Sequence, residues 1–159
     1  MLQAFKSLPV VRDVHRGELP ASAAGYARGT ITLGWEERFR VRGRRRSDEG
    51  IEFGTALERG TVLRGGDWLL VEALATAVAV VELAEPVFII RPQSAAEWAI
   101  FGYHIGNSHQ PVMITDAEIV CAILPGMTAV LDYHGIPFLR GLRPFTPLGL
   151  DRIGHRHQP

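Results

Sequence analysis

The pattern of apolar and polar residues divides the chain into two parts of different character. Up to about Glu82, apolar residues occur in short runs between glycine, proline and charged residues, with no helical period. The stretch over residues 30–42 predicts a strand with one basic face, because arginines alternate there with Phe39 and Val41. A tight hairpin is predicted around Gly65-Gly66-Asp67, between the apolar runs at 61–63 and 68–71. Residues 1–83 are therefore expected to form a small all-β domain.

After residue 83 the pattern alternates between strands and helices. Ser94 and Glu97 match a capping box, and Trp98, Phe101 and Ile105 follow at helical spacing. The predicted strands cover 87–90, 112–114, 119–123 and 136–139, and a second helix is predicted between Pro125 and Gly135. The order β-α-β-β-α-β is that of a ferredoxin-like fold. The sequence thus predicts an α+β chain with a ferredoxin-like domain over 84–149 and a mobile, histidine-containing tail over 150–159.

The segment after the first predicted helix supplies a candidate metal ligand. Gly106 and Asn107 are expected to end the helix, because both residue types accept the left-handed cap conformation, and His109 follows them. Neutral imidazole binds nickel, zinc or copper. One histidine holds a metal weakly, but a two-fold axis beside it would bring in the same residue from a second copy. The alternative is a loop histidine that bonds only to backbone.

The C-terminal tail supplies the second candidate, in Gly154-His155-Arg156-His157. Two imidazoles at positions i and i+2 of a flexible chain can turn toward one ion, although ordering the chain costs entropy. The alternative is an inert tail that happens to contain histidines.

The remaining candidates favour structural roles. His104 and His134 lie near the ends of predicted helices, where a cation complements the helix dipole. Cys121 lies inside an apolar strand, which favours a core residue over a nucleophile, and a single cysteine suits a reducing compartment. The sequence contains no hydrolase triad pattern, phosphate loop, CxxC pair or HExxH motif. These absences predict a protein that is not an enzyme.

Composition and charge exclude further classes of protein. Lys plus Arg and Asp plus Glu each number 17, so the net charge is zero, which argues against general nucleic-acid or membrane binding. No apolar run has the length of a membrane helix, and the N-terminus has no signal-peptide pattern, so a cytoplasmic protein is expected. The basic stretch could contact RNA, but neighbouring acidic residues favour a solvated face or a protein-docking surface. Its members are Arg38, Arg40, Arg42, Arg44, Arg45 and Arg46.

The segment Tyr103-His104-Ile105-Gly106-Asn107-Ser108-His109 has a close counterpart in a known family. It resembles the Tyr-His-Leu-Gly-Asn-Arg-His segment of the urease accessory protein UreE family of nickel metallochaperones, with Ile105 for Leu and Ser108 for Arg. Upstream, the basic stretch and the glycine-rich segments at 50–60 and 63–67 also resemble the family. Downstream, Pro144-Phe145-Thr146-Pro147 and the histidine tail do so too, so the likeness runs from about residue 30 to the end.

The resemblance implies a function, a site and partners. It implies a homodimer that delivers Ni(II) for assembly of the urease active site, with an N-terminal domain that binds partner proteins or peptides. By position, His109 is the ligand at the dimer axis, and His155 and His157 complete the coordination. The implied partners are the urease GTPase UreG and the apo-urease accessory complex.

Two other classes of function remain open from the sequence. One is a zinc- or copper-binding protein outside urease maturation, because imidazole binds all three metals and copper usually most tightly. The other is a peptide- or RNA-binding module that uses the arginine-rich strand. A binding module would act equally well with a chelator present, and RNA binding would weaken steeply with salt.

Overall fold

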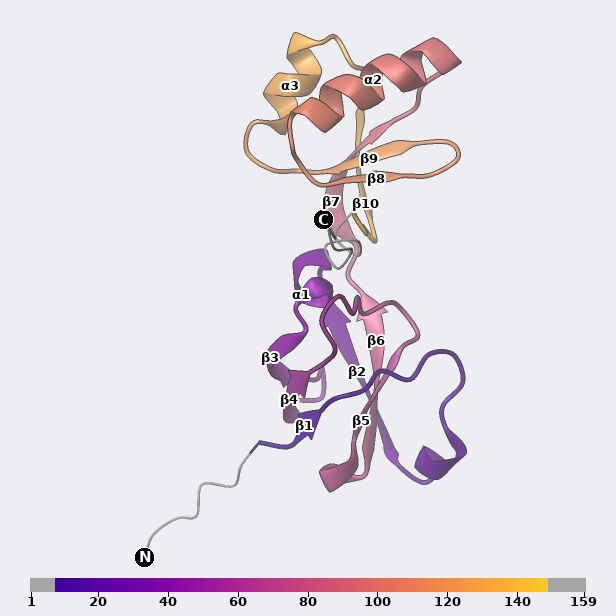
Figure 1. The fold of residues 1–159 in the computed structure, drawn as a ribbon, viewed down its shortest axis with the longest axis vertical. Helices are drawn as coiled ribbons and strands as arrows, with labels where there is room; N and C mark the ends of the chain where they lie inside the picture. The colour runs from indigo at the N-terminus through magenta and orange to yellow at the C-terminus, as the bar shows by residue number, and fades with distance from the viewer. Residues whose placement is uncertain (1–7, 149–159) are drawn as a thin grey trace, which may run out of the picture. The chain divides into compact units, whose positions relative to one another are not determined.

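The computed structural model describes residues 8–148, which divide into two compact units. The N-terminal unit ends at Glu82 and the C-terminal unit begins at Leu83. Figure 1 shows the elements of each. Within residues 8–148, every helix is too short or too polar to cross a membrane. The mixture of sheets and helices makes this an α+β chain, as the sequence predicts.

The N-terminal unit is built from two three-stranded sheets (Figure 1). The first has the order β1-β4-β3, with β1 (Val10–Val11), β3 (Arg42–Arg46) and β4 (Glu52–Ala56). The second has the order β2-β6-β5, with β2 (Ala27–Leu33), β5 (Trp68–Val71) and β6 (Thr76–Glu82). Two short 3-10 helices, η1 (Ala21–Ala23) and η2 (Glu72–Leu74), lie in connections. Both sheets contribute to one buried apolar cluster that includes Phe53, Leu63, Leu69 and Val78.

A short helix, α1 (Trp35–Phe39), corrects the prediction of an all-β domain and of a continuous strand over 30–42. Arg38 lies on this helix and not on a basic strand face, and none of its side chain is exposed. Its guanidinium forms an ion pair with Glu82 at 3.2 Å and donates to the carbonyl of Leu63 at 3.3 Å. Buried charge requires such partners, and the helix brings Arg38 to them, which an alternating strand pattern does not reveal.

The predicted hairpin around Gly65-Gly66-Asp67 is also wrong in part. The turn exists, with Gly66 at φ +86°, but residues 61–64 form no strand, and β5 pairs with β6 instead. The buried carboxylate of Asp67 accepts hydrogen bonds from the backbone of Arg64, at 2.8 Å, and from Arg16. Leu63 is fully buried in the core. The segment before the turn is therefore held by side chains rather than by a strand ladder.

Two carboxylates cover the free edge of β2. Glu49 accepts from the backbone amide of Thr30 at 2.9 Å, and Asp48 accepts from that of Thr32 at 3.2 Å. The hydrogen bond from the Thr30 hydroxyl lowers the pKa of Asp48. Because an uncovered strand edge invites pairing with another chain, these contacts close β2 to further strands and join the 47–50 turn to the second sheet.

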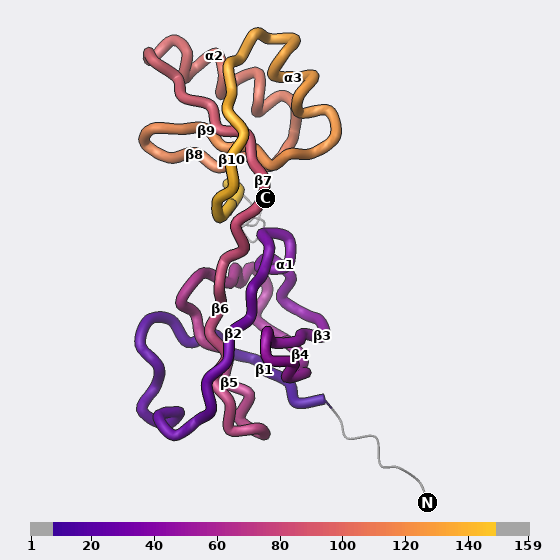
Figure 2. The backbone as a smooth tube through the Cα atoms, turned by 180° about the vertical axis from the view of Figure 1, so that it is seen from behind, coloured from indigo at the N-terminus to yellow at the C-terminus, as the bar shows by residue number. Residues whose placement is uncertain are grey.

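The C-terminal unit is one four-stranded sheet with two helices. The sheet has the order β10-β7-β9-β8, and all neighbouring strands are antiparallel. Both helices lie on one side of this sheet (Figures 1 and 2). Phe101, Ile105, Met127 and Leu131 of the helices join the buried apolar cluster. In chain order, the elements are β7 (Glu85–Ile90), α2 (Ala95–Asn107), β8 (Val112–Ile114), β9 (Ile119–Ala122), α3 (Met127–Tyr133) and β10 (Leu139–Arg143).

The last strand begins later than the sequence predicts. Residues 136–138 are irregular, and β10 starts at Leu139. Ile136 is buried in the core and Phe138 packs edge-on against Phe88, with ring centroids 4.8 Å apart. Their apolar side chains suggest a strand in the sequence, but in the structure they pack into the core from the irregular connection after α3.

Both ends of α2 lie close to the predicted caps, but each differs from the prediction in one hydrogen bond or residue. At the start, Ser94 accepts from the amide of Glu97 at 3.2 Å, but the Glu97 carboxylate bonds to the amide of Gln93 instead of Ser94. At the end, the helix continues through Gly106 and Asn107, and Ser108 is the C-cap. The residue with left-handed backbone is His109, at φ +55°. The expectation that Gly106 or Asn107 adopts this conformation is therefore wrong.

We predict that His109→Gly stabilises the protein relative to His109→Ala by about 1 kcal/mol in the absence of metal. Glycine adopts positive φ without the clash that any β-carbon introduces, and both variants remove the same imidazole. Thermal denaturation of the metal-free variants checks this. An alanine variant as stable as the glycine variant would contradict backbone strain at this position.

We predict that Arg38→Ala destabilises the protein by about 3 kcal/mol, because it removes a buried side chain and leaves Glu82 with the backbone amide of Gly65 but without its ion-pair partner. Urea denaturation followed by tryptophan fluorescence, to which Trp35 and Trp68 of the N-terminal unit contribute together with Trp98 of the C-terminal unit, measures the change. The matched control is Arg44→Ala. Arg44 pairs with Glu52 at 2.7 Å, but its side chain is 68% exposed, so its removal is expected to change stability by less than about 0.5 kcal/mol. Equal effects of the two variants would overturn the role given to Arg38.

Candidate metal site

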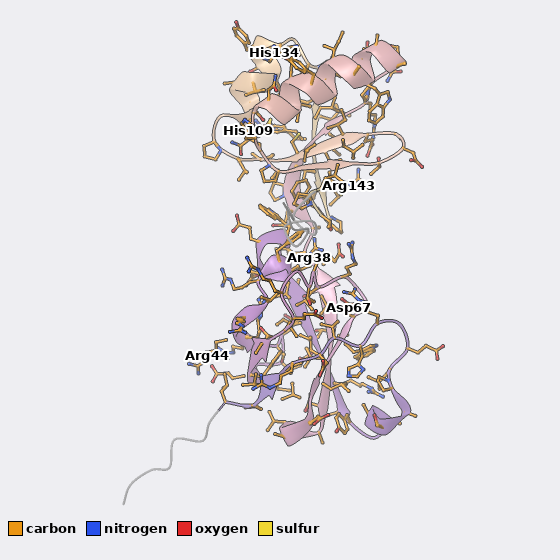
Figure 3. All side chains as sticks on the ribbon, in the orientation of Figure 1. Arg38, Arg44, Asp67, His109, His134 and Arg143 are labelled. Atoms are coloured by element: carbon orange, nitrogen blue, oxygen red, sulfur yellow. The ribbon has the colours of Figure 1, made fainter. Side chains whose placement is uncertain are left out.

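His109 is exposed at the end of α2, where the chain turns toward β8 (Figure 3). Its amide donates to the carbonyl of Gly106 at 3.1 Å, and the amide of Ser108 donates to that of Ile105. The Ser108 hydroxyl also donates to the Ile105 carbonyl, at 2.6 Å. The backbone beneath the imidazole is thus fixed by three hydrogen bonds, while the ring is open to solvent. A strained and exposed residue of this kind is typical of functional positions.

One chain does not provide a complete ligand set around His109. Among residues 8–148, no group of three His, Cys, Asp or Glu side chains is placed to hold an ion. Cys121 is fully buried in β9, and burial raises the pKa of its thiol to about 12. Because a metal binds the thiolate, Cys121 is a core residue, as its apolar surroundings in the sequence predict. The predicted tail ligands His155 and His157 lie outside the described residues.

The structure brings together two histidines that the sequence treats separately. His104, on the last turns of α2, and His134, the C-cap of α3, stack with ring centroids 3.7 Å apart and planes 19° from parallel. From the sequence, each is expected only near a helix end, because the two lie 30 positions apart in the chain. His15 of the N-terminal unit pairs through its backbone with Trp68.

The arginine-rich stretch separates into buried and exposed members. Arg45, in β3, is buried and donates to the backbone carbonyls of Glu37, at 2.9 Å, and Arg40, and burial lowers its pKa. Arg42, Arg44 and Arg46 of the same strand are exposed. Because side chains alternate along a strand, these three share one face. The strand β3 also stands at the edge of its sheet.

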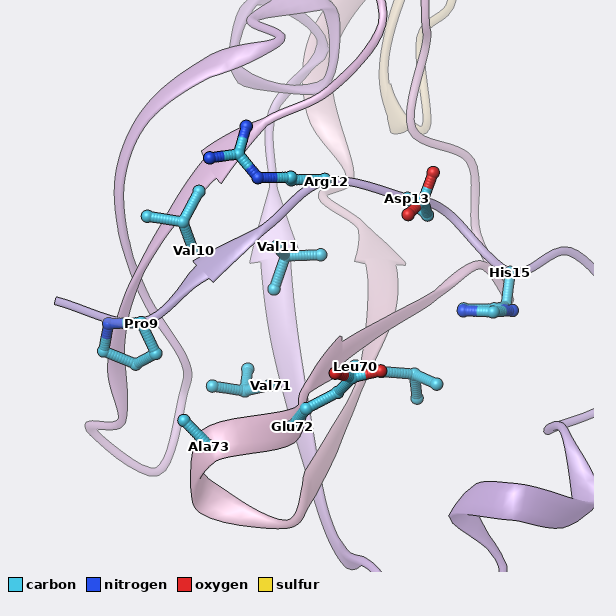
Figure 4. Close-up of a pocket in the computed structure, with 10 residues that line it drawn as sticks. All are labelled: Pro9, Val10, Val11, Arg12, Asp13, His15, Leu70, Val71, Glu72 and Ala73. Atoms are coloured by element: carbon cyan, nitrogen blue, oxygen red, sulfur yellow. The ribbon is translucent and has the colours of Figure 1, made fainter.

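A groove of about 290 Å³ opens in the N-terminal unit between two segments, residues 9–15 and residues 70–73 (Figure 4). The first segment contains β1, and the second joins the end of β5 to η2. Apolar side chains such as Val11 and Val71 lie beside Arg12, Asp13 and Glu72 in its lining. The lining of the groove thus mixes apolar and charged side chains.

Comparison with known proteins covers both units. Residues 8–82 match the family model of the UreE urease accessory protein N-terminal domain, and residues 85–159 match that of its C-terminal domain. The chain is 32% identical over 137 residues to the urease accessory protein UreE of Parasynechococcus marenigrum, covering 86% of this chain and 91% of that protein. It is 31% identical to UreE of a Nostoc species, covering 80% and 86%. For UreE of Burkholderia thailandensis the identity is 34%, covering 80% and 60%. The chain therefore belongs to the UreE family of urease accessory proteins.

Proposed function

We propose that this protein is a cytoplasmic nickel metallochaperone that delivers Ni(II) for assembly of the urease active site. It carries the metal and is not an enzyme. The observation that carries the proposal is His109: an exposed imidazole on a strained, hydrogen-bonded backbone, in the C-terminal unit of a UreE family chain. Nickel is cargo here, so the site has to bind it and also release it.

The nickel site is proposed to form across a homodimer. His109 from each of two copies would supply two ligands at the two-fold axis. A second copy is needed because residues 8–148 of one chain contain no group of three potential ligands. His155 and His157 would complete the coordination. Imidazole ligands suit nickel but also zinc and copper, so selection of nickel in the cell would rest on delivery and partners as well as on the ligands.

The fold supports this assignment. The order of elements in the C-terminal unit and its antiparallel strand order β10-β7-β9-β8 support the proposal of a ferredoxin-like domain. We propose residues 84–149 as the metal-binding and dimerisation domain and residues 1–83 as the partner-binding domain. The predicted tail, residues 150–159, lies outside the described residues.

The N-terminal domain is proposed to dock onto UreG and the apo-urease accessory complex. Two features support this. One is the exposed row of Arg42, Arg44 and Arg46 on an edge strand, since guanidinium groups bind carboxylates and do not bind cations. The other is the groove between residues 9–15 and 70–73 (Figure 4). The burial of Arg38 and Arg45 leaves a smaller basic face than RNA binding would use.

We predict that His109→Ala abolishes tight nickel binding, while His155→Ala combined with His157→Ala weakens it and speeds release. Two copies of His109 at an axis are preorganised by α2, whereas His155 and His157 are proposed only to complete the coordination. Calorimetric titration with nickel, together with the rate of nickel transfer to a chelator, separates the two effects.

The control for this prediction is the mass of each variant by light scattering. All variants should remain dimers with and without metal, so that a change in affinity reports on the ligands. A parent protein that is monomeric at every concentration, or a His109→Ala variant that binds nickel as tightly as the parent, would exclude the dimer-axis site.

We predict that replacing Arg42, Arg44 and Arg46 with serine weakens association with UreG or the urease complex at least tenfold and leaves nickel binding unchanged. The reason is that these side chains are exposed and offer no lone pair to a metal. Co-purification and nickel calorimetry measure the two properties. Unchanged association would move the docking surface elsewhere, for which the groove at residues 70–73 is the next candidate.

A further inference from the structure

The stacked pair of His104 and His134 joins the two helices of the C-terminal unit. His104 is half-buried and His134 is exposed, and the ring centroids lie 3.7 Å apart. Within residues 8–148, neither imidazole makes a hydrogen bond or an ion pair. Figure 3 labels His134 beside the end of α3. Two adjacent imidazoles without hydrogen-bonding partners leave ring nitrogens available for a ligand.

The positions of both rings are set by packing. On α2, the burial of Phe101 and Ile105 turns His104 toward α3, and on α3 the burial of Met127 and Leu131 fixes the approach to His134. Edge-on contacts support the pair from each side. Tyr103 contacts His104 with centroids 5.2 Å apart, and Tyr133 contacts His134 with centroids 4.9 Å apart.

The pair is close enough to share an ion once one ring turns. A metal ion lies in the plane of each imidazole that binds it, along the nitrogen lone pair. In the stack the two ring planes are only 19° from parallel, with centroids 3.7 Å apart, so the lone pairs do not converge on one point. Chelation therefore requires a rotation about the side-chain bonds, and the exposed His134 has room for it.

We propose that His104 and His134 form a second metal site, one in each chain, that chelates a divalent transition-metal ion of the nickel, copper or zinc class. Water fills the remaining positions of the ion. Both ligands come from one chain, so this site needs no dimer, and it uses neither His109 nor the tail. It is expected to be weaker than a site with four protein ligands and to exchange its ion quickly with solvent.

The test uses the full-length protein with His109, His155 and His157 all changed to alanine, here called the background variant. This variant lacks every ligand proposed for the dimer-axis site, so failure of either proposal is distinguishable from failure of the other. The probe is Cu²⁺, which imidazole pairs bind most tightly in this series, and nickel is titrated in parallel. The background variant is expected to bind about one ion per chain by calorimetry at neutral pH.

Adding His134→Asn or His104→Ala to the background variant should weaken Cu²⁺ binding roughly 100-fold, because a chelate becomes a single ligand. Asparagine is chosen at 134 because it is well tolerated at a helix end, and circular dichroism verifies that each variant is folded. The matched control is His15→Ala, which removes a histidine of the N-terminal unit and should leave the affinity unchanged.

A second readout follows from the placement of the two ligands on different helices. Bound Cu²⁺ should raise the melting temperature of the background variant, because an ion that binds only the folded state stabilises it. This rise should vanish when either His134→Asn or His104→Ala is added to the background variant. If the background variant binds no copper, if either substitution leaves its affinity unchanged, or if His15→Ala weakens binding equally, His104 and His134 do not form a site.

Discussion

The packing of α2 against the four-stranded sheet is the contact on which both histidine arrangements depend. Phe101 and Ile105 are the buried residues of this helix, four positions apart on one face. Their burial fixes the rotation of the helix, and that rotation turns His104 toward α3. The same packing holds the last turns of the helix against the sheet through Ile105, and His109 follows directly after the Ser108 cap. Loss of either apolar side chain would therefore disturb two groups of imidazoles at once, although neither residue contacts a metal.

The helix caps show how far local sequence patterns reach. Ser94 and Glu97 predict the start of α2 correctly, because a cap depends on residues within one turn of each other. The end was predicted less well. Gly106 and Asn107 are suitable residues for left-handed backbone, yet Ser108 prolongs the helix by bonding to Ile105, and His109 takes that conformation. A histidine in this place is a weaker choice than glycine for stability, which points to a requirement other than folding.

Long-range contacts explain most of the remaining differences between the expected and the observed fold. The alternation around Arg38 and Phe39 suggests a strand only while the partners of Arg38 are unknown. Glu82 lies 44 residues further along the chain and Leu63 lies 25 residues further, so no local window contains them. The stack of His104 on His134 was missed for the same reason. By contrast, the order of strands and helices after residue 83 follows from short-range periodicity and was predicted.

The proposed role as a metal carrier would require the protein to bind its ion firmly enough to exclude competitors and to release it on contact with the recipient. Rigid ligands favour the first requirement, because little entropy is lost when they bind. Exposed ligands with open coordination positions favour the second, because an incoming ligand can attack the ion before the old bonds break. As the proposed ligand, His109 would combine both features, because its backbone is held by hydrogen bonds at the end of a packed helix and its ring is exposed to solvent. The buried thiol of Cys121 would give a tighter bond but no route for exchange, and in this fold it serves the core instead.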